Sequence, residues 1–289
     1  MTNKEQKKLV KKAQTAEITE HIIYSRLARL AKNKHNRDIM EQISQDELKH
    51  YRFWVDQTGR ELKPSRFKIS LYVLTSRLLG LTFGLRLMER GEDMAQTQYQ
   101  KLSQNIPGVR EIINEELEHE QKLLDLLDEE RLRYVGSMVL GLNDALVELT
   151  GAISGFTLAL QDTKLIAIVS LITGISASLS MAGSEYLSTK AEEDETKHPV
   201  KASTYTGVAY AGATFVLVFP FFILPNPFLS LVWTLAHAVI IISGFTFYVS
   251  VAKNYSFRKR FSEMLAISMG VAALSFVIGL AVRQVAGIS

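Results

Sequence analysis

Cysteine is absent from the chain of 289 residues, and proline is scarce, with 6 residues. The absence of cysteine excludes disulfides, iron–sulfur clusters, thiolate zinc sites and thiol nucleophiles. Any metal site must therefore use carboxylate, imidazole or thioether ligands. The formal net charge of +3 is small and mixed, and no glycine-rich phosphate loop occurs. Nucleic acid is not expected as a partner.

Charged residues are distributed unevenly along the chain. Residues 1–134 hold 45 of the 63 Asp, Glu, Lys and Arg, and residues 135–289 hold the other 18. This contrast predicts two all-α domains, a soluble one over 1–133 and a membrane-embedded one over 134–289. The N-terminus, MTNKEQKKLVKKAQ, lacks the apolar core of a signal peptide, so the first domain is expected in the cytoplasm.

The second domain contains five apolar segments, and each is close to the about 20 residues that span a bilayer core. They are 136–160, 165–188, 203–224, 228–251 and 263–286. Basic residues near the segment ends predict a cytoplasmic N-terminus and an extracytoplasmic C-terminus in the cell membrane, because nine lie on the N-terminal side and only Lys164 and Arg283 on the other. The nine are Arg131, Arg133, Lys190, Lys197, Lys201, Lys253, Arg258, Lys259 and Arg260.

The first domain is predicted to be a bundle of four helices, over 3–32, 35–58, 66–104 and 108–133. Residues 69–85 are unexpectedly apolar for a soluble bundle. Two explanations stay open for this segment: it rests against the membrane, or it rests against a partner bundle.

Two Glu-x-x-His pairs are the main chemical signal in the bundle. Glu47 with His50, and Glu116 with His119, each place both side chains on one side of a helix. Two such pairs and one Glu from each remaining helix form the ligand set of a di-iron or di-manganese centre. The remaining helices offer two candidates each, Glu17 or Glu20 on the first and Glu89 or Glu92 on the third.

An internal repeat selects between these candidates, since a Tyr follows both Glu17 and Glu92 by seven residues. Over about residues 5–130 the chain resembles the ferritin-like superfamily, particularly rubrerythrin-type domains. The resemblance implies a di-iron cofactor, and it leaves ferroxidase activity open. The cysteine module of rubrerythrins is missing. The ligands implied are Glu17, Glu47, His50, Glu92, Glu116 and His119, with Glu89 as an extra carboxylate. His21 and His35 stand outside the pattern and are expected at the surface.

Ionisable residues inside the apolar segments are few, and their cost in lipid marks them as functional candidates. Asp144 and Glu148 are four residues apart in the first segment, and Met181 and Glu185 repeat that spacing in the second. Carboxylates together with a thioether favour iron or manganese over Mg²⁺ and Ca²⁺.

The segments GLNDALVELTGAISGF (141–156) and SMAGSEYLS (180–188) resemble the first two helices of the vacuolar iron transporter family. The resemblance covers about 134–289 and implies export of divalent iron, with inward proton movement as a candidate driving force. It also implies Asp144 and Met181 as pore ligands, joined by Glu148 and Glu185. Ala145 departs from the family's usual Gly, and only a short segment stands where plant members carry a metal-binding insertion. The fusion resembles the membrane-bound ferritin type of transporter.

Gly151 and Gly155 form a small-residue face that allows close helix packing, either in a homodimer or within one subunit. The resembled transporters are dimeric, which favours the homodimer. The leading hypothesis is an iron exporter, with manganese as an alternative cargo, whose bundle binds iron and feeds the pore. The alternatives are a membrane-anchored di-iron oxidase and a tethered iron-storage or sensing module.

Overall fold

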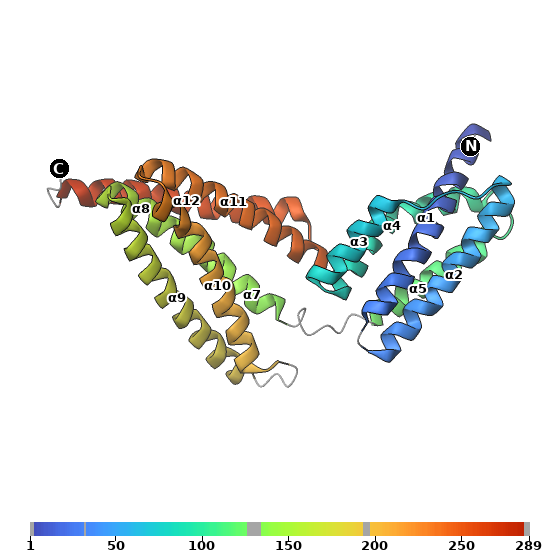
Figure 1. The fold of residues 1–289 in the computed structure, drawn as a ribbon, viewed down its shortest axis with the longest axis horizontal. Coiled ribbons are helices and arrows are strands. Elements are labelled where there is room, and N and C mark those ends of the chain that lie inside the picture. Colours follow the sequence, from blue (N-terminus) through green and yellow to red (C-terminus); the bar gives the residue numbers. More distant parts are fainter. Residues whose placement is uncertain (1–2, 32, 126–133, 193–196, 286–289) are drawn as a thin grey trace. The chain divides into compact units, whose positions relative to one another are not determined.

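The computed structural model describes residues 3–31, 33–125, 134–192 and 197–285, apart from the side chains of 3, 89–98, 124 and 125. All regular elements in these ranges are helices (Figure 1). The chain divides into two compact units, Met1–Glu129 and Glu130–Ser289. We call them the bundle unit and the membrane unit.

The bundle unit contains α1 (Asn3–Leu30), α2 (Lys34–Thr58), α3 (Arg66–Leu79), α4 (Leu81–Ser103) and α5 (Val109–Asp125). Helix α2 begins after Asn33, whose side chain accepts a hydrogen bond from the His35 amide, and ends at Gly59, whose φ of 67° is left-handed. Helix α1 packs mainly against α2, and α4 packs against α5. The predicted helical bundle is confirmed.

The third predicted helix, 66–104, is wrong as a single element. The chain breaks at Gly80, where a φ of 106° excludes a continuing helix, and α3 and α4 pack against each other. A Cβ on Gly84 would lie 1.7 Å from the Ser76 Oγ, so this corner requires glycine. The fourth predicted helix is found as α5 up to Asp125. Its remainder, 126–133, lies outside the described residues.

Two apolar clusters form the core of the bundle unit, with a polar layer between them. On α1, Val10 and Ala13 belong to one cluster and Ile23 and Leu27 to the other. On α2, Trp54 belongs to the first cluster and Met40 and Ile43 to the second. Glu17 on α1 and Glu47 on α2 fall between the clusters in both helices, and both are buried. The apolar layers therefore isolate these carboxylates from water on two sides.

The membrane unit contains α7 (Val135–Asp144), the π-helix η1 (Ala145–Leu149), α8 (Thr150–Leu160), α9 (Thr163–Ala191), α10 (Pro199–Ile223), α11 (Pro227–Ala252) and α12 (Phe257–Val285). By length and composition, α9 to α12 are candidate membrane spans. The predicted first span, 136–160, is helical throughout. Its α-helical hydrogen bonding is interrupted by η1, which separates α7 from α8.

Helices α8 and α12 approach each other closely through small residues. A Cβ on Gly279 would lie 2.4 Å from the Gly155 carbonyl oxygen, and a Cβ on Gly151 would lie 2.8 Å from Val271. The glycine face of the first predicted span therefore packs within one chain. Because α12 covers it, this face does not support a homodimer.

Candidate metal centre and membrane carboxylates

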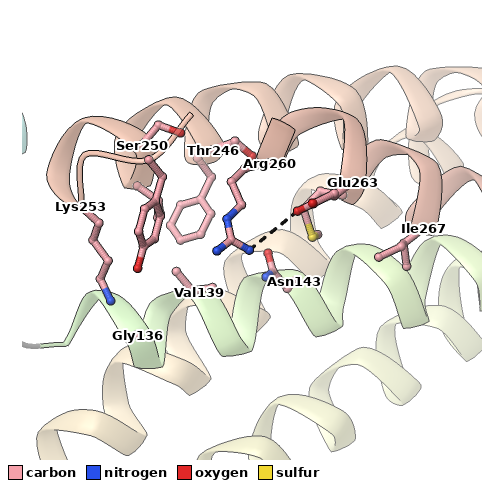
Figure 2. A pocket seen from close by; sticks show the side chains of 13 residues that line it. Gly136, Val139, Asn143, Thr246, Ser250, Lys253, Arg260, Glu263 and Ile267 are labelled. Carbon is pink, nitrogen blue, oxygen red and sulfur yellow. Dashed lines mark ion pairs between the residues drawn. The ribbon is translucent and has the colours of Figure 1, made fainter. Parts of the chain in front are cut away.

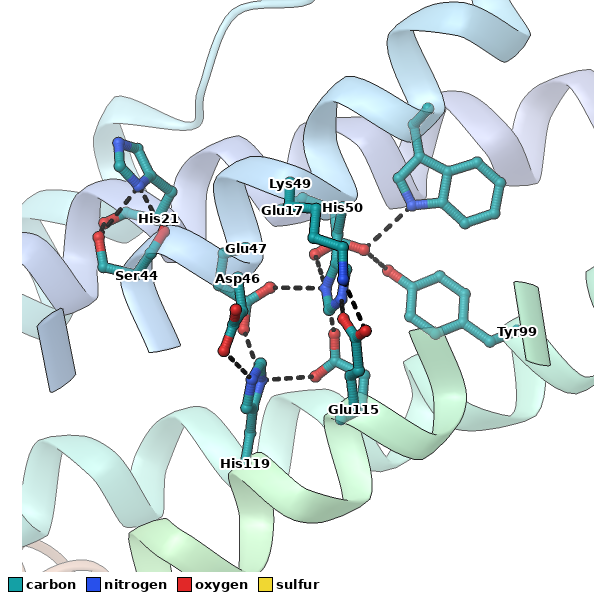
Figure 3. Close-up of polar contacts among 12 residues, drawn as sticks. Glu17, His21, Ser44, Asp46, Glu47, Lys49, His50, Tyr99, Glu115 and His119 are labelled. Carbon is teal, nitrogen blue, oxygen red and sulfur yellow. Dashed lines mark hydrogen bonds and ion pairs between the residues drawn. The ribbon is translucent and has the colours of Figure 1, made fainter. Parts of the chain in front are cut away.

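The polar layer of the bundle unit brings together residues from three helices. Glu17 comes from α1, Glu47 and His50 from α2, and Glu116 from α5. One ligand atom from each of the four lies within 4.8 Å of the others. Glu17, Glu47 and His50 are at most 2% exposed. The four predicted ligands thus form one cluster, in which Glu116 is half-buried and the other three are buried. Figure 3 labels Glu17, Glu47 and His50 of this cluster.

The fifth predicted residue, His119, faces the same cluster from α5. Its Nδ1 lies 3.3 Å from the Glu47 Oε1 and 4.0 Å from the Glu116 Oε2. The His50 Nδ1 lies 3.3 Å from the Glu116 Oε1 and 3.5 Å from the Glu47 Oε2. Both imidazoles therefore direct Nδ1 toward the same carboxylates, and their ring centroids are 5.9 Å apart.

The outer nitrogen of each imidazole is held by a carboxylate that sequence reasoning missed. The His50 Nε2 lies 2.7 Å from the Glu115 Oε2, and the His119 Nε2 lies 3.1 Å from the Asp46 Oδ2. A proton on Nε2 leaves Nδ1 as a lone-pair donor, which is how metal-binding histidines are usually oriented. Glu115 and Asp46 each precede a predicted ligand by one residue. They therefore lie off the helix face that the Glu-x-x-His spacing defines.

Glu17 is oriented by two aromatic residues. The Trp54 Nε1 donates a 3.0 Å hydrogen bond to the Glu17 Oε1, and the Tyr99 hydroxyl donates to the same oxygen. The two rings stack with centroids 5.8 Å apart. Only the Glu17 Oε2 is left facing the cluster. Tyr99, which follows Glu92 in the internal repeat, thus donates its hydrogen bond to Glu17, the corresponding glutamate of the first repeat.

Four buried atoms in this cluster have no hydrogen-bond partner: Glu17 Oε2, Glu47 Oε2, His50 Nδ1 and His119 Nδ1. Buried polar atoms are nearly always satisfied, because leaving one unpaired costs about 1–3 kcal/mol. These four converge on one place, and all four are electron-pair donors when the Nε2 atoms carry the ring protons. A mixed carboxylate and imidazole set suits Fe²⁺ or Mn²⁺. The donor set fits a metal.

The electrostatics of the cluster are consistent with this fit. Burial raises the pKa of Glu47 well above its ordinary value, and the charge of Glu116 adds to the rise. Burial also raises the pKa of Glu116. Burial lowers the pKa of His50, but contacts with Glu116, Glu17 and Glu47 outweigh it and raise that pKa overall. These shifts reflect burial first and crowded negative charge second, and a bound cation would neutralise that charge.

The remaining candidate residues of the bundle unit lie outside the described part of the structure or away from the metal cluster. Glu89 and Glu92 lie on α4, but their side chains are outside the described part of the structure. His35 is exposed, as predicted. His21 is half-buried, with its Nδ1 2.7 Å from the Ser44 carbonyl oxygen. The prediction of a surface histidine is wrong for His21, because Ser44 of α2 gives its ring a specific partner.

Two carboxylates of the membrane unit, Glu148 and Glu185, accept hydrogen bonds from hydroxyl groups. The Tyr210 hydroxyl donates a 2.9 Å hydrogen bond to the Glu148 Oε2, and the Ser137 hydroxyl donates a 2.5 Å bond to the Glu185 Oε1. Met181 packs against the small cluster that contains Tyr210 and Ala145. Asp144 is half-buried at the end of α7. Tyr210 on α10 therefore connects two of the four predicted pathway residues, a link across 62 residues that spacing could not reveal.

A separate cavity of about 290 Å³ lies between α7, α11 and α12 (Figure 2). Its lining is apolar at Val139 and Ile267 and charged at Lys253, Arg260 and Glu263. The Arg260 Nη1 lies 3.8 Å from the Glu263 Oε2. Asn143, the neighbour of Asp144, also lines this cavity. Two polar residues of the first predicted span thus have different surroundings. Asn143 lines this cavity, whereas Glu148 accepts a hydrogen bond from Tyr210 of α10.

Comparison with known families gives one finding for the membrane unit. Residues 135–198 match the model of the VIT family. The matched stretch runs from α7 through α9, so it includes Asp144, Glu148, Met181 and Glu185. Searches of curated proteins and of solved structures found no match to the chain.

Proposed function

We propose that the protein exports divalent iron, or manganese, from the cytoplasm across the cell membrane, and that its bundle unit binds the same kind of metal. The convergence of Glu17 Oε2, Glu47 Oε2, His50 Nδ1 and His119 Nδ1 carries the metal-binding part of the proposal. The match of residues 135–198 to the VIT family supports the transport part. We also propose that the bundle unit is a ferritin-like domain.

In the bundle unit, Glu47 and Glu116 would hold two metal ions between the imidazoles of His50 and His119. Glu17 would add one oxygen, and Glu92, with Glu89 as an extra carboxylate, would complete the set on α4. A bound di-iron centre would supply the redox couple for oxidising Fe²⁺ with oxygen. Glu115 and Asp46 would keep the ring protons on Nε2, so that each Nδ1 stays available.

The membrane unit would form five membrane spans, and α7, η1 and α8 together would be the first. The cargo ion would cross the membrane between these spans. Asp144 supplies a charge that strips water from the cation, and Met181 supplies a softer contact that disfavours Mg²⁺. Glu148 and Glu185 add oxygens along the route. Inward proton movement is the proposed driving force, and a homodimer is the proposed assembly. The hydroxyl contacts of Glu148 and Glu185 each involve one carboxylate oxygen.

The test is uptake of Fe²⁺ and Mn²⁺ into vesicles that contain the full chain. Asp144→Ala should abolish uptake of both ions while leaving metal bound by the bundle unit. Asp162→Asn is the matched control, because the Asp162 carboxylate caps α9 through the Leu165 amide and Asn caps a helix equally well. Full uptake by Asp144→Ala would reject the transport proposal and favour an oxidase anchored by its membrane unit.

The proposed orientation has its own test. A reporter fused after Ser289 should behave as extracytoplasmic, and one fused before Met1 as cytoplasmic, because basic residues near the span ends favour the N-terminal side. Reporters that place both ends on the same side would reject an odd number of spans.

A further inference from the structure

Helix α3 presents large apolar side chains to the outside of the bundle unit. Phe67, Leu71, Leu74 and Leu78 are 76%, 38%, 55% and 65% exposed. Their spacing of four, three and four residues places them on one side of the helix. We call these four residues the apolar stripe. Burying them would remove a large area from water, so their exposure requires an explanation.

The apolar stripe is not a misplaced part of the bundle core. The opposite side of α3 carries Ile69 and Ser76, each 5% exposed, and Ile69 belongs to the core cluster shared with α1 and α2. Helix α3 packs against α1 and α4. Because the chain turns at Gly80, α3 has a direction of its own and does not continue the bundle helix α4. One face of α3 therefore packs against the bundle, and the apolar stripe on the opposite face is left for a partner outside the bundle.

The charged residues of α3 itself are all positive. Arg66, Lys68 and Arg77 are exposed. In an α-helix of 3.6 residues per turn they lie about 90–110° from the centre of the stripe, with Lys68 on one side and both arginines on the other. Residues 62–88 contain no Asp or Glu, although the bundle unit is otherwise rich in both. An apolar face flanked by cations is typical of helices that lie in the interface of an anionic membrane.

We propose that α3 inserts its apolar stripe into the interface of a membrane that contains anionic phospholipids, with Arg66, Lys68 and Arg77 at the headgroups. A second copy of the stripe is a poorer partner. A twofold contact would bring the cations of two copies toward each other, and α3 has no acidic residue to pair with them. The surface charge of an anionic leaflet instead favours each cation by about fivefold in membrane partitioning. This inference is independent of metal binding and transport.

The cysteine-free chain allows a direct test. The variant Leu74→Cys is labelled with an environment-sensitive fluorophore in the full chain and reconstituted with phosphatidylcholine alone or with added phosphatidylglycerol. With the anionic lipid, we expect blue-shifted emission and strong quenching by lipids brominated on their acyl chains. Gln45→Cys, on an exposed position of α2, is the control and should show neither effect. Phe67→Cys gives a second reporter in case the first variant folds poorly.

A charge variant sharpens the test. Replacing Arg66, Lys68 and Arg77 by Gln should reduce quenching at position 74 to the level seen in phosphatidylcholine alone, because the headgroup attraction is removed. A label at position 74 that stays water-accessible in anionic vesicles would overturn the proposal. So would disulfide cross-linking of Leu74→Cys between two copies in detergent, because that result would assign the stripe to a contact between copies. Neither result bears on metal uptake.

Discussion

Carboxylates are held differently in the two units. In the bundle unit, Glu17 and Glu47 are 0% and 2% exposed, and each keeps one oxygen without a hydrogen-bond partner. In the membrane unit, Glu148 is exposed and accepts a hydrogen bond from the hydroxyl of Tyr210. Buried donors held in advance of binding favour a tightly bound resident ion. Exposed donors with neutral partners favour an ion that enters and leaves. This contrast fits the proposed retention of metal by the bundle unit and the proposed passage of metal through the membrane unit.

The largest expected effect separates these roles. Replacing Glu47 and Glu116 together by Ala should abolish metal binding by the bundle unit, because the two residues touch both imidazoles. Metal analysis of the purified full chain measures the loss. The chain should stay folded, since removing clustered carboxylates relieves mutual repulsion.

The matched control for this double variant replaces Glu41 and Glu118, exposed residues of the same two helices, by Ala. It should retain the full metal content. If the Glu47 and Glu116 variant still binds two ions, the cluster is not the metal centre, and the contrast between the units fails.

A smaller effect is expected from Glu115→Gln. This change keeps a hydrogen-bond acceptor for the His50 Nε2 but removes the negative charge that increases the basicity of the ring. Changes to such outer partners typically reduce metal affinity about 10–100-fold. Titration of the metal-free full chain with Fe²⁺ under anaerobic conditions measures the affinity. Glu111→Gln, an exposed position one turn earlier on α5, should leave it unchanged.

The membrane unit allows a prediction about stability. Gly279→Ala would place a Cβ 2.4 Å from the Gly155 carbonyl oxygen and force α8 and α12 apart. Overpacking of this kind costs about 1–3 kcal/mol. Gly270→Ala on the same helix meets nothing within 4 Å and should be neutral. Thermal unfolding in detergent compares the two variants, and equal midpoints would show that the α8–α12 contact is looser than described.

The smallest effect concerns selectivity. Met181→Ala should retain Fe²⁺ uptake but narrow its preference over Mg²⁺ by a few-fold, because it removes the softer of the proposed ligands. Met269→Ala, a half-buried methionine of α12, is the control. Competition between the two ions in vesicle uptake measures the ratio. An unchanged ratio in Met181→Ala would reduce Met181 to a packing residue next to Tyr210.

Local spacing in the sequence was sufficient to predict much of the bundle site. Glu47 and His50 are one helical turn apart, and Glu116 and His119 repeat the pattern, so their shared faces follow from helix geometry alone. The partners of the outer nitrogens did not follow, because Glu115 reaches His50 across 65 residues. Pairing of this kind depends on how helices cross, which no local pattern encodes.

The helix boundaries also include some that the sequence predicts and some that it does not. The end of α2 at Gly59 was predictable because glycine readily takes the left-handed conformation that closes a helix. The break at Gly80 was missed because the apolar residues on both sides continue a helical pattern through it. In the membrane unit, length and hydropathy located α9 to α12 within a few residues. The π-helical turn η1 was not expected, because the apolar pattern of the first span runs through it unbroken.

The π-helical turn links the orientation of the first span to α12. The Leu146 carbonyl oxygen accepts hydrogen bonds from the Thr150 hydroxyl at 2.5 Å and from the Ser268 hydroxyl at 2.6 Å. Loss of one residue from the turn would rotate everything on one side of it by about 100°. The hydroxyl of Ser268 thereby joins α12 to the π-helical turn that carries Glu148. A movement of α12 away from the first span would break this hydrogen bond, so the two helices are tied together at the turn that carries a carboxylate.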